Sequence, residues 1–406
     1  MAEILKFYNE EQLCGTIKWA ASAKEPLEVI GGCSKPGLGR PISTNYRLDL
    51  SGLTQIDSYQ PDELVLSLGA GVTLVEIRTL LKQNRQELAF EPPDYSSLMG
   101  ISTKTATIGG VISCNFSGPR RIKAGAARDH ILGIRGISGR GEIFKSGGTV
   151  VKNVTGYDLS KLLAGSYGTL SAITNLCVRV LPAAETTSTL LLLGLNDADA
   201  IDALGYAART SYEPSGLAHL PRELALHCNV PDAATPSTSV TAIRIEGPPE
   251  SVTDRIHSLQ KTYSHFHTTL LCEESSRTFW QEIRDVIPFS KMLNRVVWRL
   301  SVPPSAGAKV VAEIKRHVSC EAFYDWGGGL IWLALDPKET AESNHIRNTL
   351  KTHGGHALLV RARADIRRQT SVFQPQPSAL HALSTRIKDS FDPLRILNPG
   401  KMYKDI

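Results

Sequence analysis

Helical and strand-like spacings of apolar residues follow one another in the first part of the chain. Apolar side chains recur every three or four positions through residues 10–23, which predicts an amphipathic helix. A short apolar run at 27–30 predicts a strand that leads directly into the glycine-rich segment 31–39. Similar runs predict strands at 44–50 and 64–68. The chain therefore opens with units of helix, strand and glycine-rich loop.

The pattern then predicts a hairpin, a helix and a long strand. A Ser-Gly-Arg-Gly turn joins the strand-like runs 131–137 and 142–145. We expect a helix at 153–164 and a strand at 170–181. Pro182 closes this region, because proline has no N–H to donate to a neighbouring strand.

Beyond Pro182 glycine-rich loops become rare, and strands alternate with helices at a spacing that suits antiparallel pairing. This pattern is typical of an α+β fold. The predicted strands of this part lie at 190–195, 238–246, 298–302, 329–335 and 357–361, and the predicted helices at 197–211, 249–263 and 379–389.

Length and charge narrow the class of protein. A chain of 406 residues is too long for one ordinary core and suggests two or three domains. The net charge of +5 is spread along the sequence, without the basic stripe and motif that nucleic-acid binding usually requires. The densest basic stretch is 119–123 with Arg128, and we expect it to form a solvated loop.

The cysteines and the apolar runs exclude further classes. Seven scattered cysteines form no CxxC pair, which argues against a zinc site or a cysteine-ligated iron–sulfur cluster within this chain and favours a reducing compartment. Residues 1–20 lack the apolar core of a signal peptide, and no run of 18 apolar residues could span a membrane. We expect a cytoplasmic protein whose membrane contact, if any, is made through a partner.

The glycine-rich segments are the strongest candidates for chemistry. A pyrophosphate needs several converging backbone N–H donors, and glycine lets the main chain approach without a Cβ in the way. Segment 31–39 meets this need directly after a strand, although one such loop could equally be a structural turn. Two further segments, 109–118 and 165–168, strengthen the prediction of a dinucleotide cradle.

A nicotinamide site is the nearest rival. Gly69 and Gly71 follow a strand and open a helix, and Glu91 lies about 20 residues on, as in a Rossmann fingerprint. Leu74 stands where the third glycine belongs, and two prolines follow Glu91. The incomplete motif disfavours a nicotinamide cofactor there.

For four titratable residues the sequence allows both a functional and an ordinary structural role. His353 and His356 could ligate a metal or act as a base near a flavin, but no carboxylate cluster accompanies them, which favours ordinary surface or core histidines. Lys35 and Arg128 could pair with phosphate or be plain surface charges. The chain has neither a GxSxG nor an HExxH motif, so hydrolytic chemistry of those types is not indicated.

Several segments in order resemble the vanillyl-alcohol oxidase family, whose FAD-binding domain is also called the PCMH type. The resemblance covers about residues 5–182. Within this family the chain looks most like the FAD-binding subunits of glycolate oxidases, and this likeness extends almost to its end. The family segments are 29–35, 68–73, 107–110, 156–159 and 165–170, and the segments of the glycolate oxidase group are 115–121, 124–129, 152–158, 373–375 and 391–400.

The resemblance implies an α+β fold with a PCMH-type FAD-binding domain of two α+β subdomains at 1–182. A mixed α+β cap or substrate domain would follow at 183–370, and a C-terminal helix and tail at 371–406 would return to the FAD domain. Cys33 stands where covalent members of the family often carry a histidine, so we expect non-covalent FAD. The residues expected to bind the cofactor are Gly31, Gly32, Cys33, Ser34, Lys35, Thr107, Ile108, Gly109, Gly110, Ser113, Asn115, Gly118, Gly168 and Ile173.

The resemblance also implies an activity and partners. The chain would serve in a complex that oxidises glycolate to glyoxylate, beside a larger FAD-containing subunit and an iron–sulfur subunit that receives the electrons. Related 2-hydroxy-acid dehydrogenases carry a histidine-rich motif in the C-terminal domain, which is missing here, so no catalytic residue is assigned. Two alternatives stay open: a non-catalytic assembly subunit that retains the FAD fold, and a stand-alone flavin oxidase of another 2-hydroxy acid.

Overall fold

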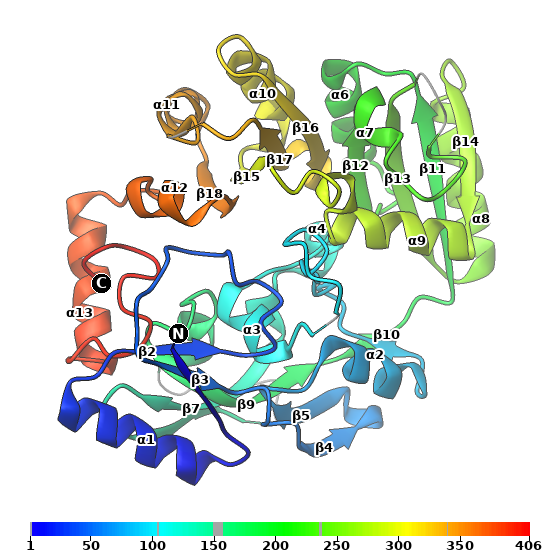
Figure 1. The fold of residues 1–406 in the computed structure, drawn as a ribbon. Coiled ribbons are helices and arrows are strands. Elements are labelled where there is room, and N and C mark those ends of the chain that lie inside the picture. The colour runs from blue at the N-terminus through cyan, green and yellow to red at the C-terminus, as the bar shows by residue number, and fades with distance from the viewer. Residues whose placement is uncertain (1, 104, 149–156, 235–237, 339) are drawn as a thin grey trace.

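The computed structural model describes residues 2–103, 105–148, 157–234, 238–338 and 340–406, and its sheets fall into two parts (Figure 1). The lower part, called the N-terminal part below, contains a three-stranded and a five-stranded sheet with their helices. The upper part, called the cap, contains an eight-stranded sheet with its helices. Helix α4 (Arg121–Ala124) lies where the two parts meet.

The first sheet is parallel and has the strand order β1–β3–β2, with β1 at Glu3–Lys6, β2 at Leu27–Ile30 and β3 at Tyr46–Asp49. Helix α1 (Glu10–Ala23) begins at Asn9, whose side chain accepts a hydrogen bond from the N–H of Gln12. Its predicted apolar face is buried in a cluster with Leu27 and Leu48. The predictions for residues 10–23 and 27–30 are confirmed.

The second sheet is antiparallel, with the order β4–β5–β9–β7–β8. Its central strand β9 carries alternating side chains into a core shared with helices α2 and α3. Of the helix predicted at 153–164, residues 153–156 lie outside the described part, and the helical remainder is α5. The elements are β4 (Ile56–Gln60), β5 (Val65–Gly69), α2 (Leu74–Lys82), α3 (Ile108–Cys114), β7 (Ile131–Ser138), β8 (Ile143–Gly147), α5 (Leu159–Leu163) and β9 (Ser171–Arg179).

One expectation for this part is wrong. The glycine-rich segment 109–118 is not a loop throughout, because Ile108–Cys114 forms the short helix α3. Thr107 starts the helix, and its hydroxyl accepts a hydrogen bond from the N–H of Gly110. The two glycines made this helix hard to see in the sequence, since glycine is a poor helix former.

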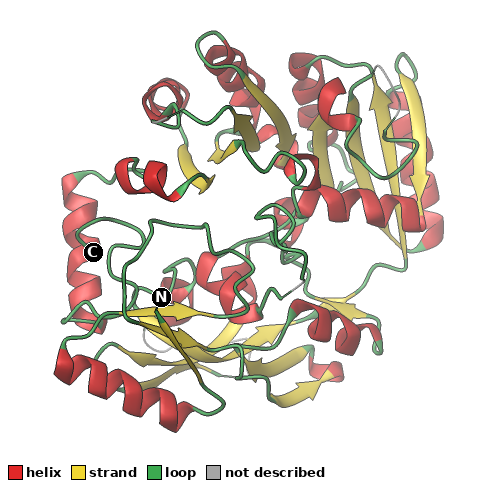
Figure 2. Ribbon diagram, viewed as in Figure 1, coloured by secondary structure: helices red, strands yellow, loops and turns green. Residues whose placement is uncertain are grey.

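The cap is built on one antiparallel sheet in the order β14–β11–β13–β12–β16–β17–β15–β18. Figure 2 shows its strands in yellow across the upper half of the molecule, with helices in red packed along them. The fully buried tryptophans Trp280, Trp298 and Trp332 belong to its core. The strands are β11 (Thr186–Leu193), β12 (Gly216–Leu220), β13 (Val240–Gly247), β14 (His267–Cys272), β15 (Val296–Ser301), β16 (Cys320–Asp325), β17 (Leu330–Leu335) and β18 (His356–Arg361).

Two small strands link the parts, and helices pack along the cap sheet. Strand β6 (Gln86–Glu87) pairs with β10 (Leu181–Pro182) at the base of the connection. The cap helices are α6 (Asp197–Ala207), α7 (Arg222–Ala225), α8 (Pro249–Thr262), α9 (Glu273–Arg284), α10 (Gly307–Lys315) and α11 (Ser343–His353). No helix in the described ranges is both long enough and apolar enough to cross a bilayer.

The C-terminal segment returns to the N-terminal part. After α12 (Ala364–Gln369), helix α13 (Ser378–Phe391) runs beside the lower sheets (Figure 1), and Leu397 bridges Leu27 in parallel. The fully buried ammonium of Lys388 donates to the carbonyl oxygens of Thr169 (2.6 Å) and Leu397 (2.9 Å) and to Asp392 Oδ2 (2.7 Å). A buried charge with these three acceptors fixes the tail against the turn that precedes β9.

Candidate functional site

A cavity of about 180 Å³ lies where four segments of the chain converge. They are the loop after β2, the start of α3, the turn before β9 and the C-terminal tail. The residues predicted from sequence that line it are Gly31, Gly32, Cys33, Ser34, Lys35, Thr107, Gly109, Gly110, Ser113, Gly168 and Ile173.

Three predicted residues do not line this cavity. Ile108 is fully buried in the core beneath it. Asn115 ends α3, and its side-chain oxygen accepts from the N–H of Arg128. Gly118 lies toward the cap, where its carbonyl oxygen accepts from Nε1 of Trp326 at 3.1 Å. Arg128, the other candidate for phosphate, is absent from the lining, and its side chain is 52% exposed.

The glycines of the first loop allow a close approach of main chains. A Cβ on Gly32 would lie 1.7 Å from the carbonyl oxygen of Thr105, and one on Gly31 would lie 2.7 Å from the hydroxyl oxygen of Thr107. Gly168 adopts φ +70°, and its Cβ would lie 2.7 Å from Nδ2 of Asn398. Larger residues at these positions would displace the cavity wall.

The pair Gly69 and Gly71 has a packing role. A Cβ on Gly69 would lie 2.2 Å from the carbonyl oxygen of Leu53, and one on Gly71 would lie 2.5 Å from that of Leu50. Between them the carbonyl oxygen of Ala70 accepts from the N–H of Gly109 at 2.9 Å, which seats α3 on this turn. The two glycines thus allow the close main-chain packing that positions α3 beside the cavity.

The lining is rich in cations. Lys35, Arg47 and Lys401 contribute positive charge and Glu28 one carboxylate, which lies 2.9 Å from Arg47 Nε and 3.4 Å from Lys401 Nζ. The ammonium of Lys35 donates to the hydroxyl of Ser34 at 2.9 Å. Burial lowers the pKa of Lys35 and that of Lys401, as expected for cations held out of water without a full set of anionic partners.

A buried hydroxyl on the wall is left unsatisfied by the described residues. Ser171, at the start of β9, is 1% exposed and lines the cavity, yet its Oγ makes no hydrogen bond within the described ranges. Buried polar atoms are normally satisfied, so this atom suits a ligand group. Together with the glycine cradle and the cations, it fits a dinucleotide with a pyrophosphate.

Several lining residues were missed from sequence. Asn398 Oδ1 accepts from the N–H of Val29 at 2.8 Å and Asn398 Nδ2 donates to the carbonyl oxygen of Tyr167 at 2.7 Å, so one side chain joins three segments. Its φ of +45° matches the turn signal Asn-Pro-Gly at 398–400, which is the sequence feature that could have indicated it. Tyr167 lies within the glycine-rich segment 165–168 but was not predicted as a site residue, and Lys401 carried no comparable signal.

Above the cavity, aromatic rings connect it to the cap. Tyr167 lines the cavity and packs edge-on against Phe116, with ring centroids 6.5 Å apart. Phe116 contacts Tyr95 at 5.1 Å, and Tyr95 contacts Trp332 of the cap sheet at 5.6 Å. The cap therefore covers the cavity side of the N-terminal part with apolar rings.

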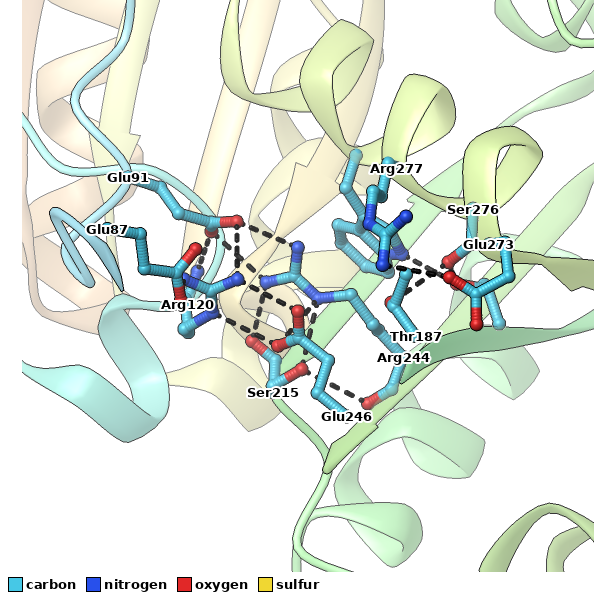
Figure 3. Close-up of polar contacts among 12 residues, drawn as sticks. Glu87, Glu91, Arg120, Thr187, Ser215, Arg244, Glu246, Glu273, Ser276 and Arg277 are labelled. Carbon is cyan, nitrogen blue, oxygen red and sulfur yellow. Dashed lines mark hydrogen bonds and ion pairs between the residues drawn. The ribbon is translucent and has the colours of Figure 1, made fainter. Parts of the chain in front are cut away.

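The expectation of a solvated loop at 119–123 is wrong for Arg120. Its guanidinium donates to Glu87 at 2.6 Å and to both carboxylate oxygens of Glu246 at 2.8 and 3.0 Å, as Figure 3 shows. Arg244 of the cap forms a second pair with Glu91 at 2.8 Å. The charge of Arg120, which the sequence predicts to be solvated, is neutralised by Glu246 of the cap and by Glu87 of the N-terminal part.

Ionisation in this network follows from its geometry. Burial opposes a charge on Glu246, but Arg244 and Arg120 outweigh it and lower the pKa of Glu246 to about 2. The pKa of Glu91 is also lowered, because the same two arginines outweigh its burial. Glu91 and Glu246 are thus charged near neutral pH, whereas burial raises the pKa of Glu87, and the network joins the N-terminal part to the cap.

The chain is similar in sequence to an FAD-binding family and to glycolate oxidase subunits. The model of a family described as "FAD binding domain" matches residues 2–147. Over 400 residues the chain is 33% identical to glycolate oxidase subunit GlcE of Escherichia coli, covering 98% of both chains. It is 26% identical over 421 residues to glycolate oxidase subunit GlcD of Bacillus subtilis, covering 97% of this chain and 87% of that one.

Solved structures share the architecture at low sequence identity. p-Cresol methylhydroxylase with substrate bound matches with a TM-score of 0.74 and 15% identity, over 99% of this chain and 88% of that chain. An alkyldihydroxyacetonephosphate synthase matches with a TM-score of 0.70 and 16% identity, over 98% and 75% of the two chains. These likenesses confirm the expected α+β fold of the PCMH type.

Proposed function

Because the chain belongs to the GlcE family of glycolate oxidase subunits, which are FAD-linked oxidoreductases, we propose that it binds FAD non-covalently in the cavity beside β2 and α3. The pyrophosphate would lie on residues 31–35 near Lys35 and Lys401. Tyr167, Gly168 and Ile173 would lie along the rest of the cofactor. The cradle carries this proposal, since a Cβ on Gly31 or Gly32 would close the space beside the main chain.

The redox chemistry would come from the cofactor, and the chain would supply its position and surroundings. When bound, FAD takes up two electrons from a substrate. The chain's part is to hold the pyrophosphate with backbone N–H groups and ammonium groups, and to exclude water with Phe116, Tyr95 and Trp332. Asn398 would keep β2 and the turn before β9 at a fixed separation around the ligand.

The wider proposal is that this chain works in a complex that oxidises glycolate to glyoxylate. A larger FAD-containing subunit would be its neighbour, and an iron–sulfur subunit would receive the electrons. Two observations support an external acceptor and a multi-subunit setting: the seven cysteines have no CxxC spacing, and the relatives named above are themselves called glycolate oxidase subunits.

Non-covalent attachment is supported at Cys33. Its thiol lies in the cavity lining, but burial and then Asp49 raise its pKa, so the reactive thiolate is scarce at neutral pH. Denaturing the FAD-loaded chain in acid should therefore release all of the flavin into the supernatant. Flavin absorbance that stays with the precipitated chain would contradict this part of the proposal.

Substitution in the cradle tests the site itself. We expect Gly32→Ala to abolish stoichiometric FAD binding, because the new methyl group would meet the carbonyl oxygen of Thr105. Gly15→Ala is the matched control, since nothing lies within 4 Å of its Cβ position. Flavin absorbance per purified chain is the measurement. Equal flavin content in both variants would place the cofactor elsewhere. An unsubstituted chain that contains no flavin after it has been supplied with FAD would favour the alternative of a non-catalytic assembly subunit.

A further inference from the structure

Two arginines at the boundary between the N-terminal part and the cap share one indole ring. Arg121 begins helix α4, and Arg299 lies in β15 of the cap. Their guanidinium carbons lie over the ring of Trp326, at 4.4 and 5.1 Å from its centroid. Among the residues that the structure describes, neither guanidinium forms an ion pair or a hydrogen bond with a carboxylate.

The register of the cap sheet shows which way Arg299 faces. Arg299 is opposite Trp332 of β17 and Leu358 of β18, and Ser301 is opposite His356. Side chains of opposite residues share a face, as do those two positions apart, so Arg299, His356 and Trp332 lie on one face. Trp332 contacts Tyr95 of the N-terminal part, so this face looks toward the cavity.

Trp326, whose ring both arginines contact, is held by the N-terminal part. Its Nε1 donates to the carbonyl oxygen of Gly118, and its backbone is held in the left-handed region at φ 52°. A bulky residue rarely adopts this conformation unless its surroundings require it. Trp326 is thus fixed relative to the 118–121 turn, which carries Arg121.

The positive charge of this pair is poorly compensated. Nε of Arg299 is buried and has no hydrogen-bond partner within the described ranges. Arginine stays charged at any physiological pH, and the pKa of Arg121 is lowered by burial and then by Arg299. Two like charges therefore share a partly buried space, an arrangement that an anion between them would stabilise.

The buried acid that precedes Trp326 in the chain does not fill this role. Asp325 is 2% exposed, and its Oδ1 accepts from the N–H of Trp326 at 2.7 Å. Burial and then Glu91 raise the pKa of Asp325 to about 7, although Arg299 opposes the shift, and the two described side chains form no ion pair. Its charge is therefore incomplete at neutral pH.

The arginine pair is next to the cofactor cavity. Arg299 lies 5.9 Å from the ring centroid of Phe116, which packs on Tyr167 in the cavity wall. His356 adds a third polar group, and its pKa is lowered by burial and then by Arg299 and Arg121. A neutral imidazole beside two guanidiniums can exchange a hydrogen bond with a hydroxyl group.

We propose that Arg121 and Arg299 bind the carboxylate of a small 2-hydroxy acid between the cap and the N-terminal part, with His356 beside its hydroxyl group. The use of this site for a substrate rests on the proposed function, whereas binding of the carboxylate does not. The planar guanidiniums suit a carboxylate, and the rings of Trp326 and Phe116 lie beside them.

Calorimetric titration of the FAD-loaded chain with glycolate, acetate and ethylene glycol in chloride-free buffer tests the site. We expect the two acids to bind and ethylene glycol, which lacks a carboxylate, not to bind. Arg299→Gln and Arg121→Gln should each weaken binding of glycolate about tenfold or more, because each removes a charge-assisted hydrogen bond. Arg299→Lys should restore part of the affinity.

The control is Arg277→Gln, which removes an exposed arginine paired with Glu273 on α9 and should leave glycolate binding unchanged. Equal affinity for glycolate in Arg299→Gln and the unsubstituted chain would overturn the inference. The absence of carboxylate binding by the folded chain would also overturn it, and would favour an acidic side chain of a partner as the group that the arginines bind. Flavin absorbance of the same samples reports separately on FAD. An FAD-free chain that still binds glycolate would contradict the proposed function and leave the carboxylate site standing.

Discussion

Arg120 and Arg121 are neighbours in the chain and meet opposite surroundings. Arg120 turns to Glu87 and Glu246, whereas Arg121 lies on the indole ring of Trp326 and forms no ion pair with any described carboxylate. The first has the partners of a structural residue, and the second has the surroundings of a binding residue. Adjacent identical residues thus differ in role because of what the cap presents to each.

The physical difference lies in how desolvation is compensated. Around Arg120 and Arg244, buried charges of both signs alternate, so each desolvated group faces an opposite charge (Figure 3). Around Arg121 and Arg299, burial of positive charge is offset mainly by the faces of aromatic rings. A site of the second kind gains stability when an anion enters, which is a property of binding sites.

The largest effect is expected from Arg120→Gln. This change leaves the carboxylates of Glu87, Glu91 and Glu246 without one of their cations, so we expect the free energy of unfolding to fall by about 3–5 kcal/mol. Urea titration followed by tryptophan fluorescence measures it. The exposed pair of Arg277 serves as the control, where the loss should stay within about 1 kcal/mol. A comparable loss in both variants would remove the distinction between a structural and a surface ion pair.

Asp325 lies between the two arginine clusters and should make stability depend on pH. Its folded pKa is raised to about 7 by burial and Glu91, against Arg244 and Arg299, while the unfolded pKa is near ~4. From about pH 4 to 7 the folded state binds more protons, so stability falls as pH rises and the loss is complete above pH 7. Asp325→Asn, which stays neutral, should therefore be more stable than the unsubstituted chain by about 4 kcal/mol at pH 8.

The same pair of proteins at pH 3 is the internal control for Asp325. There the carboxyl is protonated in both the folded and the unfolded state, so the two unfolding free energies should nearly agree. A difference of equal size and sign at pH 3 and pH 8 would assign the gain to packing instead of charge.

The smallest effect on stability is expected from Arg121→Gln. The change removes a cation–π contact and also the repulsion from Arg299, so the unfolding free energy should move by no more than about 0.5 kcal/mol. Thermal unfolding in chloride-free buffer measures it, with Arg120→Gln alongside. A loss as large as that of Arg120→Gln would show that Arg121 is structural and end the contrast between the two arginines.

The early part of the fold was predictable because local patterns and tertiary contacts agree there. Residues 10–23 and 27–30 have the expected bounds, since their apolar faces are the ones buried. Strand β1 (Glu3–Lys6) was missed because it is short and mostly exposed. Strand β14 and helix α9 (Glu273–Arg284) were missed because the first is largely exposed at the sheet edge and the second has a low mean hydropathy.

The cavity was predictable in part for a related reason. Gly31 and Gly32 lie too close to neighbouring atoms for a Cβ, and Gly168 has a positive φ. Positions of this kind require glycine, so they can be recognised in the sequence. Asn398 and Lys401 reach the same cavity from the other end of the chain, and the bridge between Leu27 and Leu397 brings them there. Ser171 has an ordinary side chain, and only its position in the wall, unsatisfied by the described residues, marks it.

The sequence by itself determined the order of the glycine-rich segments and the α+β alternation, because backbone conformation and apolar spacing are local properties. The tertiary structure alone decided which arginines are paired. Arg120 meets Glu246 across 126 residues of chain, and Arg121 meets Trp326 of the cap. Charge compensation depends on distances in space, and these are set by how the cap packs on the N-terminal part.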